Sequence, residues 1–353
     1  MKKKLIGIVC LSILFAIGST ATSYADNVIK LSLNLAIPQT HKRWVKAIKP
    51  WIVEIEKRSE GKVKILPYFA QALSKQAENY DSIVVGIADM GEAPLDRKPG
   101  RFPILENVVG FSKPSIVIKD GTYMFNELLQ NVPQLRDEMK DVKTLFVHLS
   151  SPAIIGTSKV PVKKLDDLKG LKTACFGAML SKRIKALGAS PIGMPIPDVY
   201  MGLQKGVLDA SITTYTLLTD RKFGRVIHYV TPITIGYSAF GMVMNKKVWE
   251  KLPKDVQNVF EEVNRDVALD LFNKFWWERT IMAKKIFEES MGGKSHFLSS
   301  DDLAKIEKNW REIDKKYLDR KMKINPSDKD KIMAEFRKLE LKYGTTLIEA
   351  YGN

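Results

Sequence analysis

The chain has 353 residues and carries 56 lysines and arginines against 40 aspartates and glutamates, a formal net charge of +16. A basic chain is a candidate for nucleic-acid binding, but here the lysines are spread along the sequence and mixed with acids. The composition therefore predicts a solvated basic surface, not a nucleic-acid partner. The length exceeds that of one typical domain and predicts two.

The first 25 residues have the order of a secretory signal peptide. Lysines at positions 2–4 precede a mostly apolar run over 5–18, and Ser23 and Ala25 place small residues at the cleavage site. A membrane anchor is the alternative, but a spanning helix needs about 20 apolar residues. We expect cleavage after residue 25 and a periplasmic protein. Cys175 would then be the one remaining cysteine, which leaves no internal disulfide.

Strand and helix patterns alternate along the chain. Period-two alternation predicts a strand over 28–35, and apolar residues at helical spacing predict a helix over 41–58. Further elements follow in order: a strand at 63–66, a helix at 77–86, and strands at 87–90, 145–149, 154–158, 171–176, 207–212 and around 240–244. This rhythm predicts an α/β protein with mostly parallel sheets covered by helices.

The segment from Lys254 to Ser290 contains no glycine and no proline, and it has an apolar stripe at helical spacing. As one helix it would run about 50 Å, enough to span two lobes. The alternative is two helices that meet at a bend near Asn273. No low-complexity linker separates two halves of the chain, so we expect crossing strands to join the lobes.

The sequence contains none of the common catalytic or nucleotide-binding signatures. Its four histidines lie far apart and lack the spacing of metal ligands. We therefore expect a binding protein with no catalytic residue, no metal site and no cofactor. A periplasmic enzyme that uses the same kind of cleft is the less favoured alternative.

Several segments give the chain a family likeness. They are Ser59–Val63, Gly86–Met90, Asp167–Lys172, Leu187–Pro191, Leu203–Asp209 and Val243–Pro253. In this order and spacing the chain resembles the periplasmic solute-binding proteins of TRAP transporters, of the dicarboxylate-binding DctP type. The likeness covers nearly the whole sequence after residue 25.

The resemblance implies a two-lobed α/β fold with a long helix spanning both lobes. Lobe I would comprise residues 26–151 and 239–278, and lobe II residues 152–238 and 279–353. It also implies a monomer that closes around a small organic solute, typically an organic acid, and delivers it to TRAP membrane subunits. A ligand sensor that docks to a membrane receptor is an alternative.

The sequence departs from the family where relatives bind a ligand carboxylate. The arginine that usually follows the Asp167–Lys172 segment is replaced by Ala174, and a second arginine found in some relatives falls at Ile154. The glutamate expected after Asp209 is absent as well. The guanidinium groups that would match a carboxylate bidentately are therefore missing.

Two hypotheses remain open for the ligand. It is either an acid held by another cation, with His41, Arg97, Arg101 and Arg183 as candidates, or a neutral or aromatic solute in an apolar slot that includes Ile212. Trp276 and Trp277 are expected to pack within their helix. The full predicted ligand-binding set is His41, Glu92, Arg97, Arg101, Ile154, Ala174, Phe176, Thr213, Thr214, Tyr215 and Tyr237. Core packing is the alternative role for each.

Overall fold

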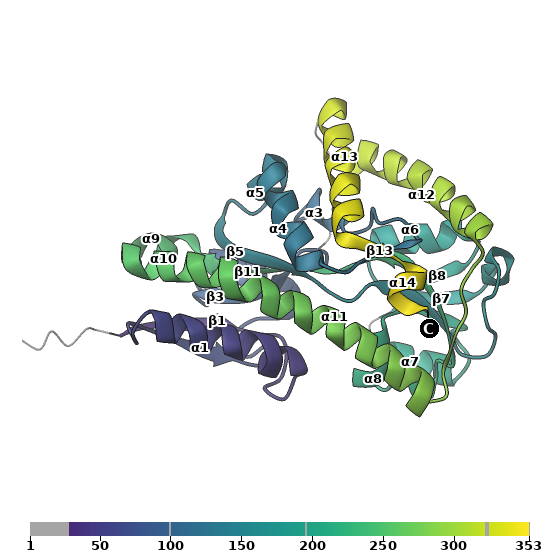
Figure 1. The fold of residues 1–353 in the computed structure, drawn as a ribbon, viewed down its shortest axis with the longest axis horizontal. Helices are drawn as coiled ribbons and strands as arrows, with labels where there is room; N and C mark the ends of the chain where they lie inside the picture. Colours follow the sequence, from purple (N-terminus) through teal and green to yellow (C-terminus); the bar gives the residue numbers. More distant parts are fainter. Residues whose placement is uncertain (1–27, 99, 195, 322–324, 353) are drawn as a thin grey trace, which may run out of the picture.

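The computed structural model describes residues 28–98, 100–194, 196–321 and 325–352. The predicted signal peptide lies outside the described residues. Two β-sheets with their covering helices lie side by side and give the molecule an elongated shape (Figure 1). We call the part around the first sheet lobe I and the part around the second sheet lobe II.

The sheet of lobe I has the strand order β2-β1-β3-β11-β5. Its strands are β1 (Ile29–Asn34), β2 (Val63–Tyr68), β3 (Met90–Pro94), β5 (Val142–Leu149) and β11 (Ala239–Asn245). β1 pairs in parallel with β2 and β3, whereas β11 is antiparallel to β3 and β5. The late strand β11 thus lies between two early strands, so the chain returns to lobe I after building lobe II.

The sheet of lobe II has the order β12-β10-β6-β9-β7-β8. Its strands are β6 (Ala153–Thr157), β7 (Lys172–Cys175), β8 (Ser190–Gly193), β9 (Ala210–Thr213), β10 (Tyr229–Gly236) and β12 (Lys294–Ser295). β7 is parallel to β8 and β9, but β6 is antiparallel to β9 and β10. The α/β fold is confirmed, while the expectation of mostly parallel sheets holds for only part of each sheet. In each sheet the strand that enters from the other lobe, β6 in lobe II and β11 in lobe I, is antiparallel to both of its neighbours.

Helices cover both sheets. Lobe I carries η1 (Trp44–Ile48), α1 (Lys49–Arg58), η2 (Gln76–Glu78), α2 (Asn79–Val84), α3 (Leu105–Val108), α4 (Gly121–Asn131), α5 (Pro133–Asp137) and α9 (Lys246–Lys251). Lobe II carries η3 (Leu165–Leu168), α6 (Ala178–Ala186), α7 (Ile196–Gln204), α8 (Tyr215–Asp220) and η4 (Phe223–Arg225). Within the described residues, no helix is both long and apolar enough to cross a membrane.

The predicted long helix is confirmed. It is continuous through α10 (Lys254–Val263), η5 (Asn264–Ala268), α11 (Leu269–Lys285) and η6 (Ile286–Ser290). Phe260 and Phe272 pack in the core of lobe I, whereas Ala283 and Phe287 pack in lobe II. The ribbon of the helix runs along both halves of the molecule (Figure 1). The helix therefore spans both lobes. It does not break near Asn273, whose side chain bonds to Asp120 and to the N–H of Thr122.

The C-terminal helices also contact both lobes. α12 (Ser300–Lys321) places Ile306 and Trp310 in the core of lobe II. α13 (Pro326–Tyr343) places Phe336 and Leu339 in the core of lobe I, whereas the boundaries implied by the family resemblance put residues 279–353 in lobe II. β13 (Gly344–Thr346) then pairs with β4 (Ile116–Ile118), and α14 (Leu347–Tyr351) follows.

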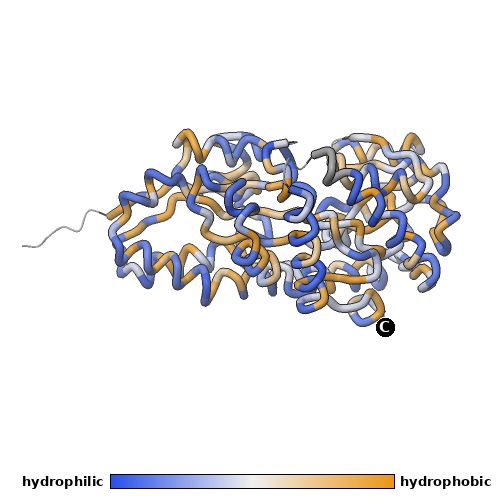
Figure 2. The backbone as a smooth tube through the Cα atoms, turned by 90° about the horizontal axis from the view of Figure 1, so that it is seen from above, coloured by the Kyte–Doolittle hydropathy of each residue, from blue (hydrophilic) through white to orange (hydrophobic). Residues whose placement is uncertain are grey.

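Each lobe encloses its own apolar core. Figure 2 shows apolar residues throughout both halves of the molecule, with hydrophilic residues interspersed along every segment. Trp51 is fully buried in lobe I, where its ring meets Phe146 edge-on and its indole N–H donates to Asn264 on the long helix. Burying a side chain of this size removes roughly 150–250 Å² from water. These contacts hold the long helix on lobe I.

Candidate functional site

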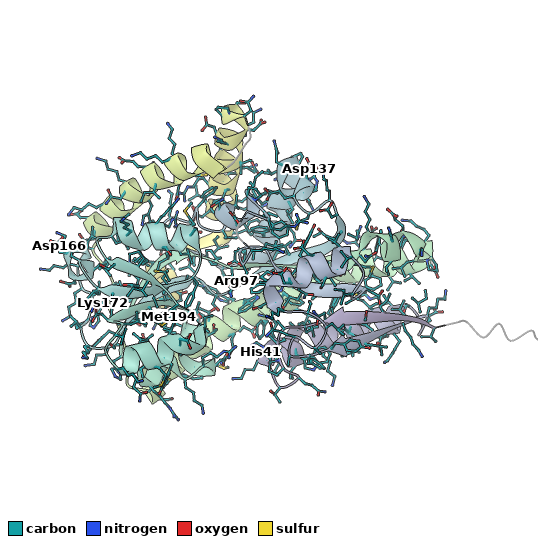
Figure 3. All side chains as sticks on the ribbon, turned by 180° about the vertical axis from the view of Figure 1, so that it is seen from behind. His41, Arg97, Asp137, Asp166, Lys172 and Met194 are labelled. Carbon is teal, nitrogen blue, oxygen red and sulfur yellow. The ribbon has the colours of Figure 1, made fainter. Side chains whose placement is uncertain are left out.

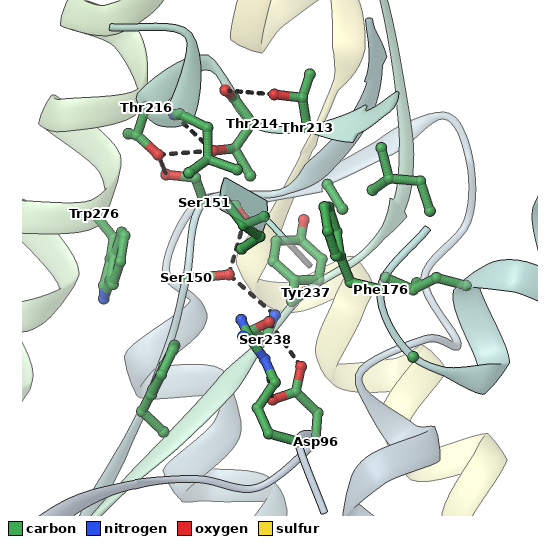
Figure 4. A pocket seen from close by; sticks show the side chains of 18 residues that line it. Asp96, Ser150, Ser151, Phe176, Thr213, Thr214, Thr216, Tyr237, Ser238 and Trp276 are labelled. Atoms are coloured by element: carbon green, nitrogen blue, oxygen red, sulfur yellow. Dashed lines mark hydrogen bonds and ion pairs between the residues drawn. The ribbon is translucent and has the colours of Figure 1, made fainter. Parts of the chain in front are cut away.

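A cavity of about 180 Å³ lies where the two lobes meet. Lobe I contributes the loop after β3, strand β11 and helix α11, while lobe II contributes β9, α8 and the start of α6 (Figure 4). Its lining comprises Asp96, Arg97, Ser150, Ser151, Ala153, Phe176, Gly177, Leu180, Ile196, Ile212, Thr213, Thr214, Thr216, Leu217, Tyr237, Ser238, Phe240 and Trp276. A second cavity of about 390 Å³ adjoins it and shares Asp96, Phe176, Gly177, Leu180 and Tyr237.

Two connections that cross between the lobes form part of this wall. Ser150 and Ser151 follow β5 and lead into lobe II, and Tyr237 and Ser238 follow β10 and lead back into lobe I. The crossings bond to each other: Ser150 N–H donates to the carbonyl of Ser238 over 2.8 Å, and Ser238 N–H donates to Ser150 Oγ over 3.0 Å. The cavity therefore contacts both segments that join the lobes.

The aromatic wall on the lobe I side is held by a buried chain of polar groups. Trp276 Nε1–H donates to His148 Nδ1 over 3.0 Å, and His148 Nε2 lies 3.1 Å from Glu92 Oε1. Glu92 Oε2 in turn accepts from the Arg43 guanidinium over 2.6 Å. Because Nδ1 accepts, the neutral imidazole carries its proton on Nε2 and donates to Glu92.

The charges in this chain follow from burial and pairing. Burial favours a raised pKa for Glu92, but the Arg43 guanidinium and the hydrogen bond with His148 outweigh it and lower the pKa to about 2. Burial lowers the pKa of His148, which therefore stays neutral. Arg43 also stacks over the rings of Phe240 and Trp276, at 5.0 and 5.3 Å from their centroids. Glu92 thus lies behind the wall of the cavity.

His41 lies beside this chain and not in the cavity lining. Its Nδ1 accepts from the backbone N–H of Arg43 over 3.0 Å. Burial, and then the nearby Arg43 charge, lower the pKa of His41 to about 4. The imidazole is therefore neutral near pH 7 and supplies no cation.

Arg97 is the one cationic side chain among the described residues that line the cavity. It lies between the two lobes, in the centre of the view in Figure 3. Its Nε is 3.5 Å from Asp96 Oδ1, and its side chain is 34% exposed. Burial raises the pKa of the Asp96 carboxyl, an effect that Arg97 and the hydroxyl of Ser238 oppose. The cavity thus contains one cation, one adjacent acid, several hydroxyls and an aromatic wall.

The structure brings together some of the predicted site residues. Arg97, Phe176, Thr213, Thr214 and Tyr237 all line the cavity. Gly177 lies directly after Phe176 with φ +86°, a conformation that glycine adopts without strain, and α6 begins at the next residue.

Arg101 is directed elsewhere. Its guanidinium pairs with Asp81 and Asp141, each at 3.0 Å, and lies over the ring of Tyr80. It is absent from the cavity lining. Arg97, which faces the cavity, is thus close in sequence to an arginine that is committed to structural ion pairs.

Three other predicted residues lie in the core of lobe II. Ile154, Ala174 and Tyr215 are at most 1% exposed and belong to one apolar cluster. In the sheet, Ile154 pairs with Thr213, and Ala174 pairs with Ser211 and Ile192. Arg183 is fully buried and bonded to Asp314 on α12. None of these four side chains lines the cavity.

Sequence reasoning did not identify the polar residues of the crossings or Asp96. Ser150, Ser151 and Ser238 lie in short polar interruptions between apolar strands, which is the one local signal available. It did identify Trp276, but as a packing residue, whereas the structure places its ring at the cavity. Within the described ranges, no group of three histidine, cysteine or carboxylate side chains is arranged to hold a metal ion.

Two α/β lobes, a cavity between them, crossing strands and a helix that spans both define a two-lobed solute-binding protein. Residues 36–321 match the family described as bacterial extracellular solute-binding protein, family 7 (DctP). The chain belongs to this family, the periplasmic solute-binding proteins of TRAP transporters, whose members bind solutes and are not enzymes.

Relatives and solved structures agree with this assignment. The chain is 26% identical over 316 residues to the C4-dicarboxylate-binding periplasmic protein DctP of Rhodobacter capsulatus, covering 84% of this chain and 89% of the relative. It is similar to a TRAP periplasmic solute binding protein from Desulfovibrio salexigens, with a TM-score of 0.80, 26% identity and coverage of 90% and 97%. It is also similar to a marine metagenome TRAP protein specific for aromatic acid ligands, with a TM-score of 0.77, 25% identity and coverage of 89% and 98%.

Proposed function

We propose that this protein is the periplasmic binding subunit of a TRAP transporter and captures a small aromatic acid with a single carboxylate. Lobe closure would enclose the ligand, and TRAP membrane subunits would receive it. Residues 1–25 would direct export. The observation that carries the proposal is the position of Arg97, the one cation among the described residues of a cavity otherwise lined by aromatic, apolar and hydroxyl groups and Asp96.

The charges of the cavity favour a monoanion. A buried carboxylate needs a partner, because an unpaired charge out of water is strongly unfavourable. Arg97 supplies one guanidinium, and the neighbouring Asp96 side chain is a carboxyl group, which adds no positive charge. Within the cavity of about 180 Å³, a second ligand carboxylate would meet no further cation among the described lining residues. The related aromatic-acid protein, which was solved with 3-hydroxybenzoate, supports a ligand with one carboxylate.

The walls favour a flat apolar body. Phe176, Tyr237, Phe240 and Trp276 present rings to the cavity, and aromatic pairs are stabilised by offset or edge-on contact beyond simple burial. The Thr213, Thr214 and Thr216 hydroxyls, from the β9–α8 segment of lobe II, line another part of the cavity (Figure 4). Ring substituents that form hydrogen bonds would be directed there.

A neutral aromatic solute is the second candidate. Asp96 lies 3.5 Å from Arg97, so the cation is already partly compensated without a ligand. In this alternative, Arg97 and Asp96 would act as one neutral polar pair. Recovery of an uncharged solute would support it.

Mass spectrometry of ligand released from the natively purified protein, followed by calorimetric titration, tests the proposal. Benzoate, 3-hydroxybenzoate and phenylacetate would be compared with succinate. Arg97→Gln should weaken binding of the acid by about 10- to 100-fold, because hydrogen bonds to charged groups contribute about 1.5–3 kcal/mol. Arg101→Gln, a matched change outside the cavity, should leave affinity within about twofold. Equal affinity in wild type and Arg97→Gln would refute the acid-binding role of Arg97.

A further inference from the structure

Asp96 joins the cation of the cavity to the connections between the lobes. Asp96 Oδ2 accepts from the hydroxyl of Ser238 over 2.7 Å, and Ser238 bonds twice to Ser150 on the other crossing (Figure 4). Ser150 Oγ donates to the carbonyl of Ser151, whose own hydroxyl lies 2.7 Å from Thr280 Oγ1 on α11. A continuous path therefore runs from Asp96 through both crossings to the spanning helix.

The contact between Asp96 and Arg97 is incomplete. Asp96 Oδ1 is buried and has no hydrogen-bond partner in the described part of the chain. The Arg97 Nε at 3.5 Å is beyond the usual range of an N–H···O hydrogen bond. A shift of a few tenths of an ångström would complete the Nε–Oδ1 bond and leave the terminal nitrogens for a ligand carboxylate.

We infer that Asp96 is a positioning residue that links Arg97 to Ser238. Through this link, binding of a ligand acid is coupled to the angle between the lobes. This inference rests on the proposed acid-binding role of Arg97. With the acid bound, Arg97 is fixed between ligand and Asp96, and Asp96 fixes Ser238. Without the acid, the weak Asp96–Arg97 contact lets the crossing move independently of Arg97.

Ser238 is the best place to interrupt this path, because it contacts Asp96 without carrying charge. Ser238→Ala removes the link and keeps both Asp96 and Arg97. Ser238→Thr keeps the hydroxyl and serves as the conservative rescue. Ser158→Ala, directly after β6 and outside the cavity, is the matched control for loss of a serine hydroxyl.

The test is a double-mutant cycle of Ser238→Ala with Arg97→Gln, read as affinity for 3-hydroxybenzoate by calorimetry. Residues that share a network show non-additive effects. We expect Ser238→Ala to weaken binding at least about fivefold when Arg97 is present, but less than about twofold in the Arg97→Gln background. Ser238→Thr should stay within about twofold of wild type, and Ser158→Ala should change nothing.

Small-angle X-ray scattering gives a second readout, the contraction of the protein on ligand binding. A purely structural role of Ser238 would leave this contraction unchanged. At saturating 3-hydroxybenzoate, the wild type should contract, and Ser238→Ala should contract less. Equal effects of Ser238→Ala in both backgrounds, or full contraction of that variant, would overturn the positioning role while leaving acid binding intact. Failure of the wild type to bind any of the tested acids would instead refute the proposed function and, with it, this inference.

Discussion

Replacing Glu92 by glutamine should destabilise lobe I strongly. The Glu92 side chain is fully buried, and its partner Arg43 is 5% exposed. Glutamine keeps the shape and can still accept from His148, but it removes the negative charge that compensates the Arg43 guanidinium. Removing one partner of a buried ion pair leaves an uncompensated charge and costs about 3–5 kcal/mol.

The expected change in melting temperature follows from the size of the protein. Unfolding entropy is roughly 2.1 cal/mol/K per residue, so for roughly 320 folded residues a loss of 3–5 kcal/mol lowers Tm by about 4–8 °C. Differential scanning calorimetry is the suitable assay, because it resolves two transitions if the lobes unfold separately. Any separate transition of lobe II should keep its Tm.

The double variant Arg43→Gln/Glu92→Gln separates charge from shape. Removing both charges eliminates the unpaired guanidinium, so most of the loss should be recovered. If Glu92→Gln melts within about 1 °C of wild type, the loss of the Glu92 charge does not leave the Arg43 guanidinium uncompensated, and the reasoning is wrong. A double variant that is less stable than Glu92→Gln alone would likewise contradict the reasoning.

Two further predictions concern lobe II and pH. Asp314→Asn should lower the free energy of unfolding by about 3–5 kcal/mol in urea titrations, because Asp314 is the counter-ion of the fully buried Arg183. The control is Asp166→Asn, in the exposed pair with Lys169, which should have no measurable effect. The pKa of His41 is lowered from 6.5 to about 4 in the folded state by burial and by Arg43, among neighbours that also include Glu92, Asp220 and Arg221. The unfolded chain therefore binds a proton more readily, and stability that is present above pH 6.5 should decline between pH 6.5 and about 4. Discounted for partial exposure, the contribution is about 1–2 kcal/mol, and His41→Gln should flatten this part of a Tm–pH profile.

Secondary structure was predicted best in segments where a periodic pattern extends over many residues and tertiary contacts have little influence. The stripe from Lys254 to Ser290 contains enough turns to distinguish a helix from a strand, and the helix is continuous over that range. The strand–helix alternation from 28 to 90 is equally regular, although β3 begins at Met90, where the predicted strand ends. Strand direction was predictable only in part, because it depends on where the chain crosses between lobes.

The residues that line the cavity were harder to predict, because each one depends on the direction in which a single side chain points. Arg97 and Arg101 lie on one loop with no periodic pattern, and sequence spacing cannot tell which of them faces the cavity. Arg101 turns away because Asp81 and Asp141, distant in sequence, pair with it. Asp96 and Ser238 are 142 residues apart in the sequence, so no local sequence pattern predicts their hydrogen bond.

The packing at the two positions where the family resemblance would place an arginine bears on where, in our proposal, a cation could come from. Ile154 and Ala174 are fully buried, and their strand neighbours are Thr213, Ser211 and Ile192. An arginine built into this packing would require a carboxylate or several carbonyls to balance it, because a buried guanidinium without partners is not tolerated. Apolar side chains of lobe II pack around both positions. In our proposal the cation therefore comes from the loop after β3 in lobe I, where Asp96 connects it to the crossing strands.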